Sequence, residues 1–287
     1  MAQGVEWVGS SAGPEEGPKG SEEVEREVRE LRAQVRRLQE QVSALASRPR
    51  DQAGRVPTHV RGLDGTIEGG IPRGHVVVIA GPTGSMKTSL GLHILAKNRA
   101  AGLRGVYVTI EEGRDSLLET MRRFGLGETE DFLVDIGRLR LEHAGTEEVR
   151  NWMQVLQDYL SRRRERDPVG IVVIDSINAL IALTQMNDVR AELFRFFNFL
   201  RSLGVATIGI LELDPMRPGL EADVEFLSDG LFELRFSGAG EGKVKLLVRC
   251  AKMRHTNHSR DYFELSHDGK GFVAHPYEEP RRRWGRR

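Results

Sequence analysis

The feature that most constrains this chain is a glycine-rich segment between a buried strand and a helix. The apolar run VVVIA at 76–80 leads into GPTGSMKT at 81–88, and the helical pattern SLGLHILAKNRAA follows. A strand, a tight turn and a helix N-terminus in this order present backbone N–H groups to an anion. We therefore expect a phosphate-binding loop, in which Lys87 meets the terminal phosphates and Thr88 binds Mg²⁺.

One position departs from the consensus of such a loop. The consensus G-x-x-x-x-G-K-[ST] has Gly immediately before the Lys, whereas this chain has Met86. Gly84 can adopt an unusual backbone angle, but it does not remove the side chain at 86. The sequence leaves open whether Met86 impairs binding or hydrolysis, or belongs to a working variant. The predicted nucleotide-binding residues are Gly81, Pro82, Thr83, Gly84, Ser85, Met86, Lys87, Thr88 and Ser89.

Two later strand patterns end in carboxylates. GLRGVYVTIEE at 102–112 ends in Glu111 and Glu112, and GIVVIDSINAL at 170–180 carries Asp175 after four apolar residues. The carboxyl ends of parallel strands meet at one edge of a sheet, where a nucleotide binds. An Asp in the position of Asp175 usually holds Mg²⁺ through water. Either strand end alone is ordinary, but with the glycine-rich loop they predict a site for a nucleotide and Mg²⁺.

Segments before and after these strands complete a family pattern. They are LDGTIEGGIPRG at 63–74, FLSDGLFEL at 226–234 and AKMRHTNHSRDYFEL at 251–265. Together with the loop they resemble the KaiC-like ATPases of the RecA superfamily, over about Gly62 to Pro276. The resemblance implies a RecA-type α/β core with a mostly parallel sheet, and ATP and Mg²⁺ as ligands.

The resemblance also implies roles for single residues. Glu111 and Glu112 match paired glutamates, one of which positions and deprotonates the attacking water; we favour Glu111, although the sequence does not separate them. Lys252 and Arg254 match cations that reach the nucleotide of a neighbouring subunit. Their alternative is a solvated strand edge. The favoured role predicts a homo-oligomer, as a ring of six.

The chain outside this region divides into shorter parts. Residues 1–20 are rich in Gly, Ser, Pro and Glu and are predicted to be disordered. Residues 21–48 predict a coiled coil, 49–57 a linker, 58–276 the ATPase domain, and 277–287 a basic tail around Trp284. The tail either contacts nucleic acid or another anionic surface, or is a flexible solubilising end. The heptad seam consists of Val24, Val28, Leu31, Val35, Leu38, Val42 and Leu45, a mixture that favours a parallel pair of helices over one amphipathic helix packed on its own domain.

Periodicity predicts the elements of the ATPase domain. An early alternation of strands and helices indicates a parallel sheet, and a late run of strands around GAGEG at 238–242 indicates a hairpin at its edge. The predicted helices are 87–101, 114–125, 146–165 and 188–203. The predicted strands are 76–80, 105–110, 132–136, 170–175, 205–211, 231–237, 243–251, 261–265 and 271–274.

Two other functions compete with an ATPase that assembles. A DNA recombinase of the same superfamily would bind DNA through loops at 184–189 and 213–225, but these are nearly devoid of basic residues, so nucleic-acid binding through the ring axis is not expected. A nucleotide-sensing scaffold without hydrolysis is favoured by Met86. The positions that would correspond to the phosphate-accepting Ser-Thr pair of the clock protein in this family hold Glu225 and Phe226, which cannot accept phosphate.

Composition excludes several classes. The formal net charge is zero, and Cys250 is the only cysteine, so no disulfide can form within the chain. No apolar stretch approaches the roughly 20 residues of a membrane span, and the N-terminus does not resemble a signal peptide. We therefore expect a cytoplasmic protein without a membrane partner, while a protein partner is possible and is not named by the sequence.

Overall fold

A computed structural model of the chain describes residues 54–127, 131–138, 152–184, 188–213, 218–238 and 243–278. The chain divides into two units, Met1–Arg50 and Asp51–Arg287, and all described residues belong to the second. The predicted disordered segment 1–20 and the predicted coiled coil 21–48 therefore lie outside the described residues.

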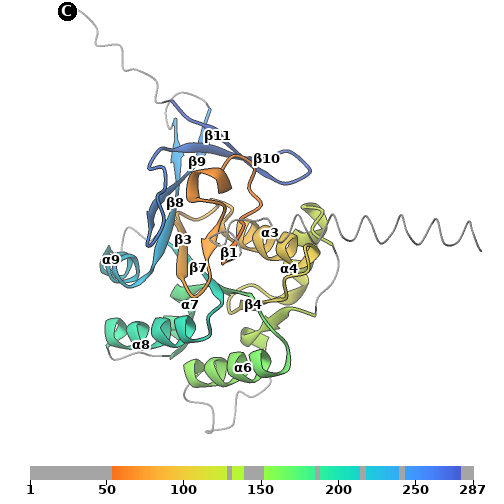
Figure 1. Cartoon of the computed structure of the whole chain (residues 1–287), viewed down its shortest axis with the longest axis vertical. Coiled ribbons are helices and arrows are strands. Elements are labelled where there is room, and N and C mark those ends of the chain that lie inside the picture. The colour runs from red at the N-terminus through yellow and green to blue at the C-terminus, as the bar shows by residue number, and fades with distance from the viewer. Residues whose placement is uncertain are drawn as a thin grey trace, which may run out of the picture. The chain divides into compact units, whose positions relative to one another are not determined.

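The second unit is built on a nine-stranded sheet in the order β11-β10-β9-β8-β3-β7-β6-β4-β5 (Figure 1). The strands are β3 (Val76–Gly81), β4 (Gly105–Thr109), β5 (Leu133–Asp135), β6 (Ile171–Asp175), β7 (Ala206–Glu212), β8 (Gly230–Ser237), β9 (Lys245–Met253), β10 (Phe263–His267) and β11 (Phe272–Pro276). The six strands from β8 to β5 in this order pair in parallel, and β8, β9, β10 and β11 pair antiparallel. The α/β class and the parallel core are confirmed, and each predicted strand matches an observed one within two residues. The strands on either side of 238–242, β8 and β9, pair antiparallel as predicted, but they lie inside the sheet because β10 and β11 form its edge.

Helices cover both faces of the parallel strands. They are α3 (Lys87–Ala100), α4 (Arg114–Arg123), α6 (Trp152–Arg166), α7 (Ile177–Thr184), α8 (Val189–Ser202) and α9 (Pro218–Leu227). Figure 1 shows α3 and α4 on one side of the sheet and α8 and α9 on the other. Every residue of β3 is buried, as expected for a strand covered on both faces.

Two hydrophobic cores result from this arrangement. Alternate residues of β3 enter different cores: Val77 and Ile79 pack with α3 and α4, whereas Val76 and Val78 pack with α6, α7 and α8. This alternation follows from the period of two in a strand. The strands that end at the predicted site are therefore packed against a hydrophobic core on each face.

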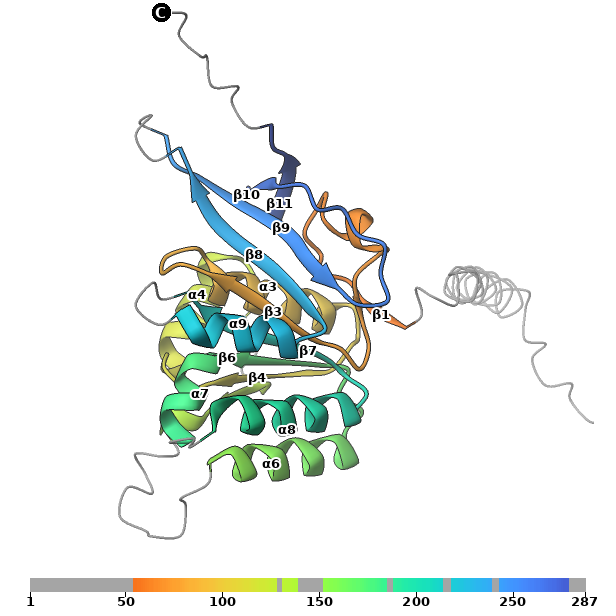
Figure 2. The same cartoon turned by 90° about the vertical axis from the view of Figure 1, so that its left-hand side faces the viewer.

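The long hairpin of β8 and β9 extends the sheet beyond the parallel strands (Figure 2). Cys250 is buried in β9, and burial raises the pKa of its thiol to about 12. The thiol therefore stays protonated and unreactive at neutral pH.

The sequence missed several elements. Helix α7 was not predicted because its apolar residues continue the apolar run of β6, and the loop predicted at 213–225 is helical from Pro218 as α9. The end of the predicted linker 49–57 contains β1 (Arg55–Val56), which pairs with β2 (Ile71–Pro72). Strands of two residues are too short to show alternation. A 3₁₀ helix, η1 (Asp64–Ile67), lies between these two strands in the chain.

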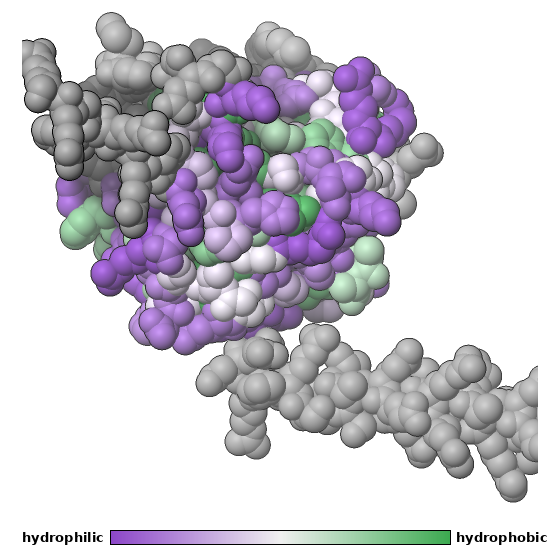
Figure 3. Space-filling model, turned by 90° about the horizontal axis from the view of Figure 1, so that it is seen from above, coloured by the Kyte–Doolittle hydropathy of each residue, from purple (hydrophilic) through white to green (hydrophobic). Residues whose placement is uncertain are grey.

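One face of the described part is largely polar. Seen from above in Figure 3, hydrophilic residues cover most of the coloured face. The exposed large hydrophobic residues of the described part are Val155, Phe194, Phe226, Phe236 and Val244. None of the described helices is long and apolar enough to cross a membrane.

Candidate nucleotide-binding site

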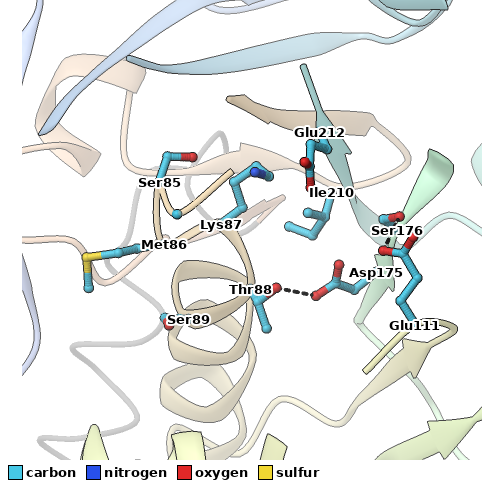
Figure 4. Close-up of a pocket in the computed structure, with 11 residues that line it drawn as sticks. Ser85, Met86, Lys87, Thr88, Ser89, Glu111, Asp175, Ser176, Ile210 and Glu212 are labelled. Carbon is cyan, nitrogen blue, oxygen red and sulfur yellow. Dashed lines mark hydrogen bonds between the residues drawn. The ribbon is translucent and has the colours of Figure 1, made fainter. Parts of the chain in front are cut away.

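A pocket lies where the glycine-rich loop meets the carboxyl ends of β4, β6 and β7. Its cavity volume is about 370 Å³. The lining residues are Gly84, Ser85, Met86, Lys87, Thr88, Ser89, Glu111, Asp175, Ser176, Ile210 and Glu212. The structure thus brings most of the predicted site residues together, from segments that are far apart in the sequence (Figure 4).

The glycine-rich loop is organised around one carbonyl oxygen. The carbonyl of Pro82 accepts hydrogen bonds from the Ser85 hydroxyl at 2.7 Å and from the Lys87 ammonium at 2.8 Å. Gly84 has a φ of +78°, and a Cβ placed there would meet nothing within 4 Å. The loop therefore has open space beside its backbone, as the binding of a phosphate requires.

Met86 has a left-handed backbone conformation, which glycine adopts more easily than other residues. Its φ is 63° and its ψ is 24°, and helix α3 begins at the next residue. A left-handed conformation costs a residue with a Cβ about 1–2 kcal/mol. The Met86 side chain points away from Lys87 and Asp175 (Figure 4) and packs against the core beneath α3, which offsets this cost. Met86 therefore provides the left-handed backbone conformation at the position where the consensus has glycine.

Asp175 is held at the end of β6 by two hydroxyl groups. Its Oδ2 atom accepts hydrogen bonds from Thr88 at 2.7 Å and from Tyr107 at 2.6 Å. Burial, followed by the charge of Asp175, raises the pKa of Tyr107 well above its usual value, so the phenol remains a donor. The pairing of Thr88 with Asp175 brings the predicted Mg²⁺ residues into contact.

The donor chemistry fits Mg²⁺. This ion prefers oxygen ligands and is usually bound by one or two protein groups together with water and substrate phosphates. Thr88 supplies a hydroxyl and Asp175 supplies a carboxylate. Both hydrogen bonds that the Asp175 carboxylate accepts from the described residues go to its Oδ2 atom. Within those residues no cluster of three His, Cys, Asp or Glu side chains forms a cage for a metal ion.

The two predicted glutamates have different surroundings. Glu111 lines the pocket and accepts a hydrogen bond from the Ser176 hydroxyl at 3.1 Å. Glu112 does not line it, and its carboxylate accepts a hydrogen bond from Ser116 on α4 at 2.6 Å. Tertiary structure therefore separates two residues that the sequence left equivalent, and it favours Glu111.

Sequence reasoning missed Ser176, Ile210 and Glu212. Glu212 ends β7, and its backbone N–H and C=O groups are bound by the Asn178 side chain at 2.8 and 3.1 Å. Its carboxylate accepts a hydrogen bond from the Thr83 hydroxyl. The sequence does contain a signal for Glu212. Like Glu111 and Asp175, it is a carboxylate at the end of a buried strand pattern.

Lys87 is the cation of the pocket lining. Its ammonium is buried, and desolvation lowers its pKa, while the charges of Glu212, Asp175 and Glu111 act in the opposite direction. A buried ammonium beside a cavity supplies positive charge where terminal phosphates would bind.

Lys252 and Arg254 do not lie in this pocket. Met253 pairs with Gly230, which in turn pairs with Val77 near the start of β3, so these cations lie at the amino edge of the parallel strands. Since β3 and β7 contain 6 and 7 residues, the two edges are separated by roughly 20 Å. Within one chain, neither cation can contact a nucleotide held by its own loop.

The two cations differ in their own contacts. The Lys252 ammonium donates to three backbone carbonyls at and just after the C-terminal end of α9, those of Glu225, Phe226 and Ser228, at 2.8, 3.3 and 2.8 Å. Arg254 donates to Asp229 at 3.0 Å, and its side chain is 47% exposed. Burial, and next the charge of Arg254, lower the pKa of Lys252. Lys252 is thus engaged within its own chain, whereas Arg254 is accessible.

The fold and the site together define an α/β nucleotide-binding domain of the RecA type. A protein-family model described as "ATPase: KaiC" matches residues 56–278. The chain therefore belongs to the KaiC ATPase family, and the predicted resemblance is confirmed.

Individual relatives agree with this assignment. The chain is 29% identical to the circadian clock protein KaiC3 of Synechocystis sp., over 81% of this chain and 48% of the relative. It is 30% identical to a UPF0273 protein of Thermotoga maritima, over 78% of this chain and 97% of the relative. A crystal structure of a KaiC-like protein from Pyrococcus horikoshii matches with a TM-score of 0.65 and 27% identity, over 77% of this chain and 99% of the other. The chain spans about half the length of the clock relatives that it matches, but nearly the whole of the other two.

Proposed function

We propose that this protein binds ATP with Mg²⁺, hydrolyses it slowly and acts through homo-oligomeric assembly. The observation that carries the proposal is the grouping of Lys87, Thr88 and Asp175 around one cavity, with Glu111 facing it. Membership of the KaiC ATPase family supports the same conclusion.

Each residue of the pocket has a task in this proposal. Backbone N–H groups of the loop bind phosphate oxygens, and Lys87 leaves the Pro82 carbonyl to meet the terminal phosphates. Thr88 and Asp175 would hold Mg²⁺, which neutralises charge on the phosphates when it is bound. Glu111, oriented by Ser176, accepts a proton from the attacking water.

Slow turnover follows from the charges in a single chain. Only Lys87 among the lining residues is a cation, while Glu111, Asp175 and Glu212 are carboxylates. Phosphoryl transfer is accelerated by a second cation that stabilises charge on the transferring group. A single chain provides none in its described pocket, so efficient hydrolysis depends on a cation from another subunit.

Arg254 is the residue best placed to supply that cation to a neighbour. Its position at the opposite edge requires a head-to-tail contact, and repeated head-to-tail contacts close into a ring. We propose a ring of six subunits. Pairing of the predicted coiled coils at 21–48 would then join the subunits of one ring as three dimers.

A nucleotide-sensing scaffold without significant hydrolysis is the second candidate. It is favoured by Met86 at the consensus glycine position and by the exposure of Glu111 to solvent.

A recombinase fits the family assignment less well. Of the residues proposed for its second DNA-binding loop, Asp223 and Glu225 lie on α9 and are acidic, and Asp223 pairs with Arg190.

Substitution of the general base tests the proposal. We expect Glu111→Gln to retain ATP binding and to lower phosphate release by roughly 100-fold or more, whereas Glu112→Gln changes it much less. The variant with both substitutions should bind ATP without hydrolysis. Calorimetry measures binding, and a phosphate-release assay measures turnover. Wild-type turnover no greater than that of Lys87→Ala would replace the ATPase with the scaffold.

A further inference from the structure

A buried tyrosine contacts the predicted Mg²⁺ residues from beneath the pocket. Tyr107 lies in the middle of β4, and none of its surface is exposed. Its ring packs in the core shared with α3, and it does not line the cavity. Its hydroxyl donates a hydrogen bond of 2.6 Å to Oδ2 of Asp175. Tyr107 therefore reaches Asp175 from the side of the core, and not from the side where a nucleotide would bind.

The ring of a phenylalanine would fill the same part of the core, so the hydroxyl needs a separate explanation. A buried hydroxyl is unfavourable unless it forms a hydrogen bond, and hydrogen bonds to charged groups are the stronger ones. The ring is also closely packed: a Cβ added at Gly91 of α3 would lie 3.7 Å from Cε2 of Tyr107. Packing of the ring between β4 and α3 therefore keeps the hydroxyl at Asp175.

The hydrogen bonds to the Asp175 side chain leave one of its two oxygens available. Oδ2 accepts from Tyr107 and also from Thr88, at 2.7 Å. The terminal torsion of an Asp side chain is soft, so a carboxylate without such partners turns easily. Two donors on Oδ2 hold the carboxylate, and Oδ1 accepts no hydrogen bond from the described residues. Figure 4 shows this second oxygen turned away from Thr88.

The two donors differ in what nucleotide binding would do to them. Thr88 lines the pocket, and its hydroxyl oxygen is the atom that would turn to Mg²⁺. Tyr107 lies outside the lining, so its hydrogen bond to Asp175 can persist when the pocket is filled. Groups that hydrogen-bond to metal ligands orient them, and the loss of one such group typically lowers metal affinity by about 10- to 100-fold.

We propose that Tyr107 is a positioning residue for Mg²⁺, which holds Asp175 with Oδ1 available to the ion. The inference rests on the proposed binding of ATP with Mg²⁺ in this pocket. Tyr107 touches neither the ion nor the nucleotide, but it determines how strongly Mg²⁺ raises the affinity for the nucleotide. Removal of its hydroxyl alone should weaken that contribution and leave the phosphate contacts of Lys87 unchanged.

Calorimetry on the full chain tests this role. It would measure the affinity of a non-hydrolysable ATP analogue in EDTA and in saturating Mg²⁺, and the ratio of the two affinities is the gain from Mg²⁺. Tyr107→Phe keeps the ring in the core and removes only the hydroxyl. We expect the gain to fall by about tenfold and the affinity in EDTA to stay unchanged.

A matched control and a double-mutant cycle complete the test. Tyr159→Phe removes the hydroxyl of a half-buried tyrosine on α6, in the other core, and should leave both affinities as in the wild type. Asp175→Ala should remove most of the gain. Adding Tyr107→Phe to Asp175→Ala should then change the gain no further, because the carboxylate that Tyr107 orients is already absent.

Three results would overturn the role of Tyr107. They are a full gain from Mg²⁺ in Tyr107→Phe, an equal weakening of binding in EDTA and in Mg²⁺, and a further loss of gain in the double variant. Any of them, with a normal gain in the wild type, would reject the role of Tyr107 and leave the proposed function intact. A wild type that binds the analogue no better than Lys87→Ala, or that gains nothing from Mg²⁺, would reject the proposed function and this inference with it.

Discussion

The two edges of the parallel sheet carry similar residues in opposite circumstances. At the carboxyl edge, Lys87, Asp175 and Glu111 surround a cavity. At the amino edge, buried Asp229 accepts hydrogen bonds from Arg201, Arg254 and the backbone N–H of Val76. The charged side chains of the carboxyl edge face a cavity. Those of the amino edge bind one another. A charged residue at a strand end therefore indicates a ligand site only where its partners within the chain leave it available.

Asp229 shows how fully the amino edge is satisfied. Burial raises the pKa of its carboxyl, but the hydrogen bonds from Arg201 and Val76 outweigh this, so its pKa is lower than usual. The carboxylate is therefore charged at neutral pH and holds Arg254 in place. The amino edge thus orients one accessible cation, and it uses Lys252 to stabilise α9.

The largest effect is expected at the carboxyl edge, for the cation of the pocket. Lys87→Ala removes the cation of the pocket lining, and we expect a loss of ATP affinity of roughly 100-fold or more, measured by calorimetry. Lys97→Ala is the matched control, because Lys97 lies on the same helix but outside the pocket. Equal ATP affinity in Lys87→Ala and the wild type would show that the cavity is not the nucleotide site.

The next effect concerns the accessible cation of the amino edge. Arg254→Ala should lower turnover by roughly 100-fold and weaken ATP-dependent assembly, because a neighbour's site loses a cation that stabilises the transferring phosphate. Deletion of residues 1–50 should leave that assembly intact. Light scattering with and without ATP measures assembly, and Arg260→Ala is a control on an exposed arginine outside the pocket.

Opposite results from these variants would revise the proposal. A deletion variant that stays monomeric in ATP would mean that the N-terminal segment assembles the protein. Full turnover in Arg254→Ala would remove the amino edge from the reaction.

The smallest effect separates Lys252 from Arg254. Lys252→Met leaves three backbone carbonyls at the end of α9 without their donor, and we expect a loss of about 2 kcal/mol in the free energy of unfolding without nucleotide. Lys245→Met, on the same strand, removes a surface ion pair with Glu264 and a cation–π contact with Tyr277, and should cost less than about 1 kcal/mol. Chemical denaturation measures both. A Lys252→Met variant as stable as the wild type would indicate that this lysine faces a neighbour instead.

Much of the fold could be predicted because its signals are local. The run VVVIA is buried on both faces, and helix α3 starts directly after the loop, as the pattern of 81–88 indicated. Helix α7 escaped prediction for the same reason, since its apolar residues cannot be distinguished locally from the end of β6. Helix α9 escaped because a stretch rich in Asp, Glu, Pro and Gly resembles a loop.

From local patterns alone, the chain could be assigned a glycine-rich loop between a strand and a helix, two strands that end in Glu111 and Asp175, and a family. These features could be placed together because parallel strands that follow one another through helices must end at the same edge of the sheet. Tertiary structure alone decided that Glu111, and not Glu112, faces the cavity, that Glu212 joins it, and that Lys252 binds α9. These outcomes depend on contacts with Ser176, Thr83 and Phe226, residues brought close only when the sheet and helices pack, and no local pattern encodes such contacts.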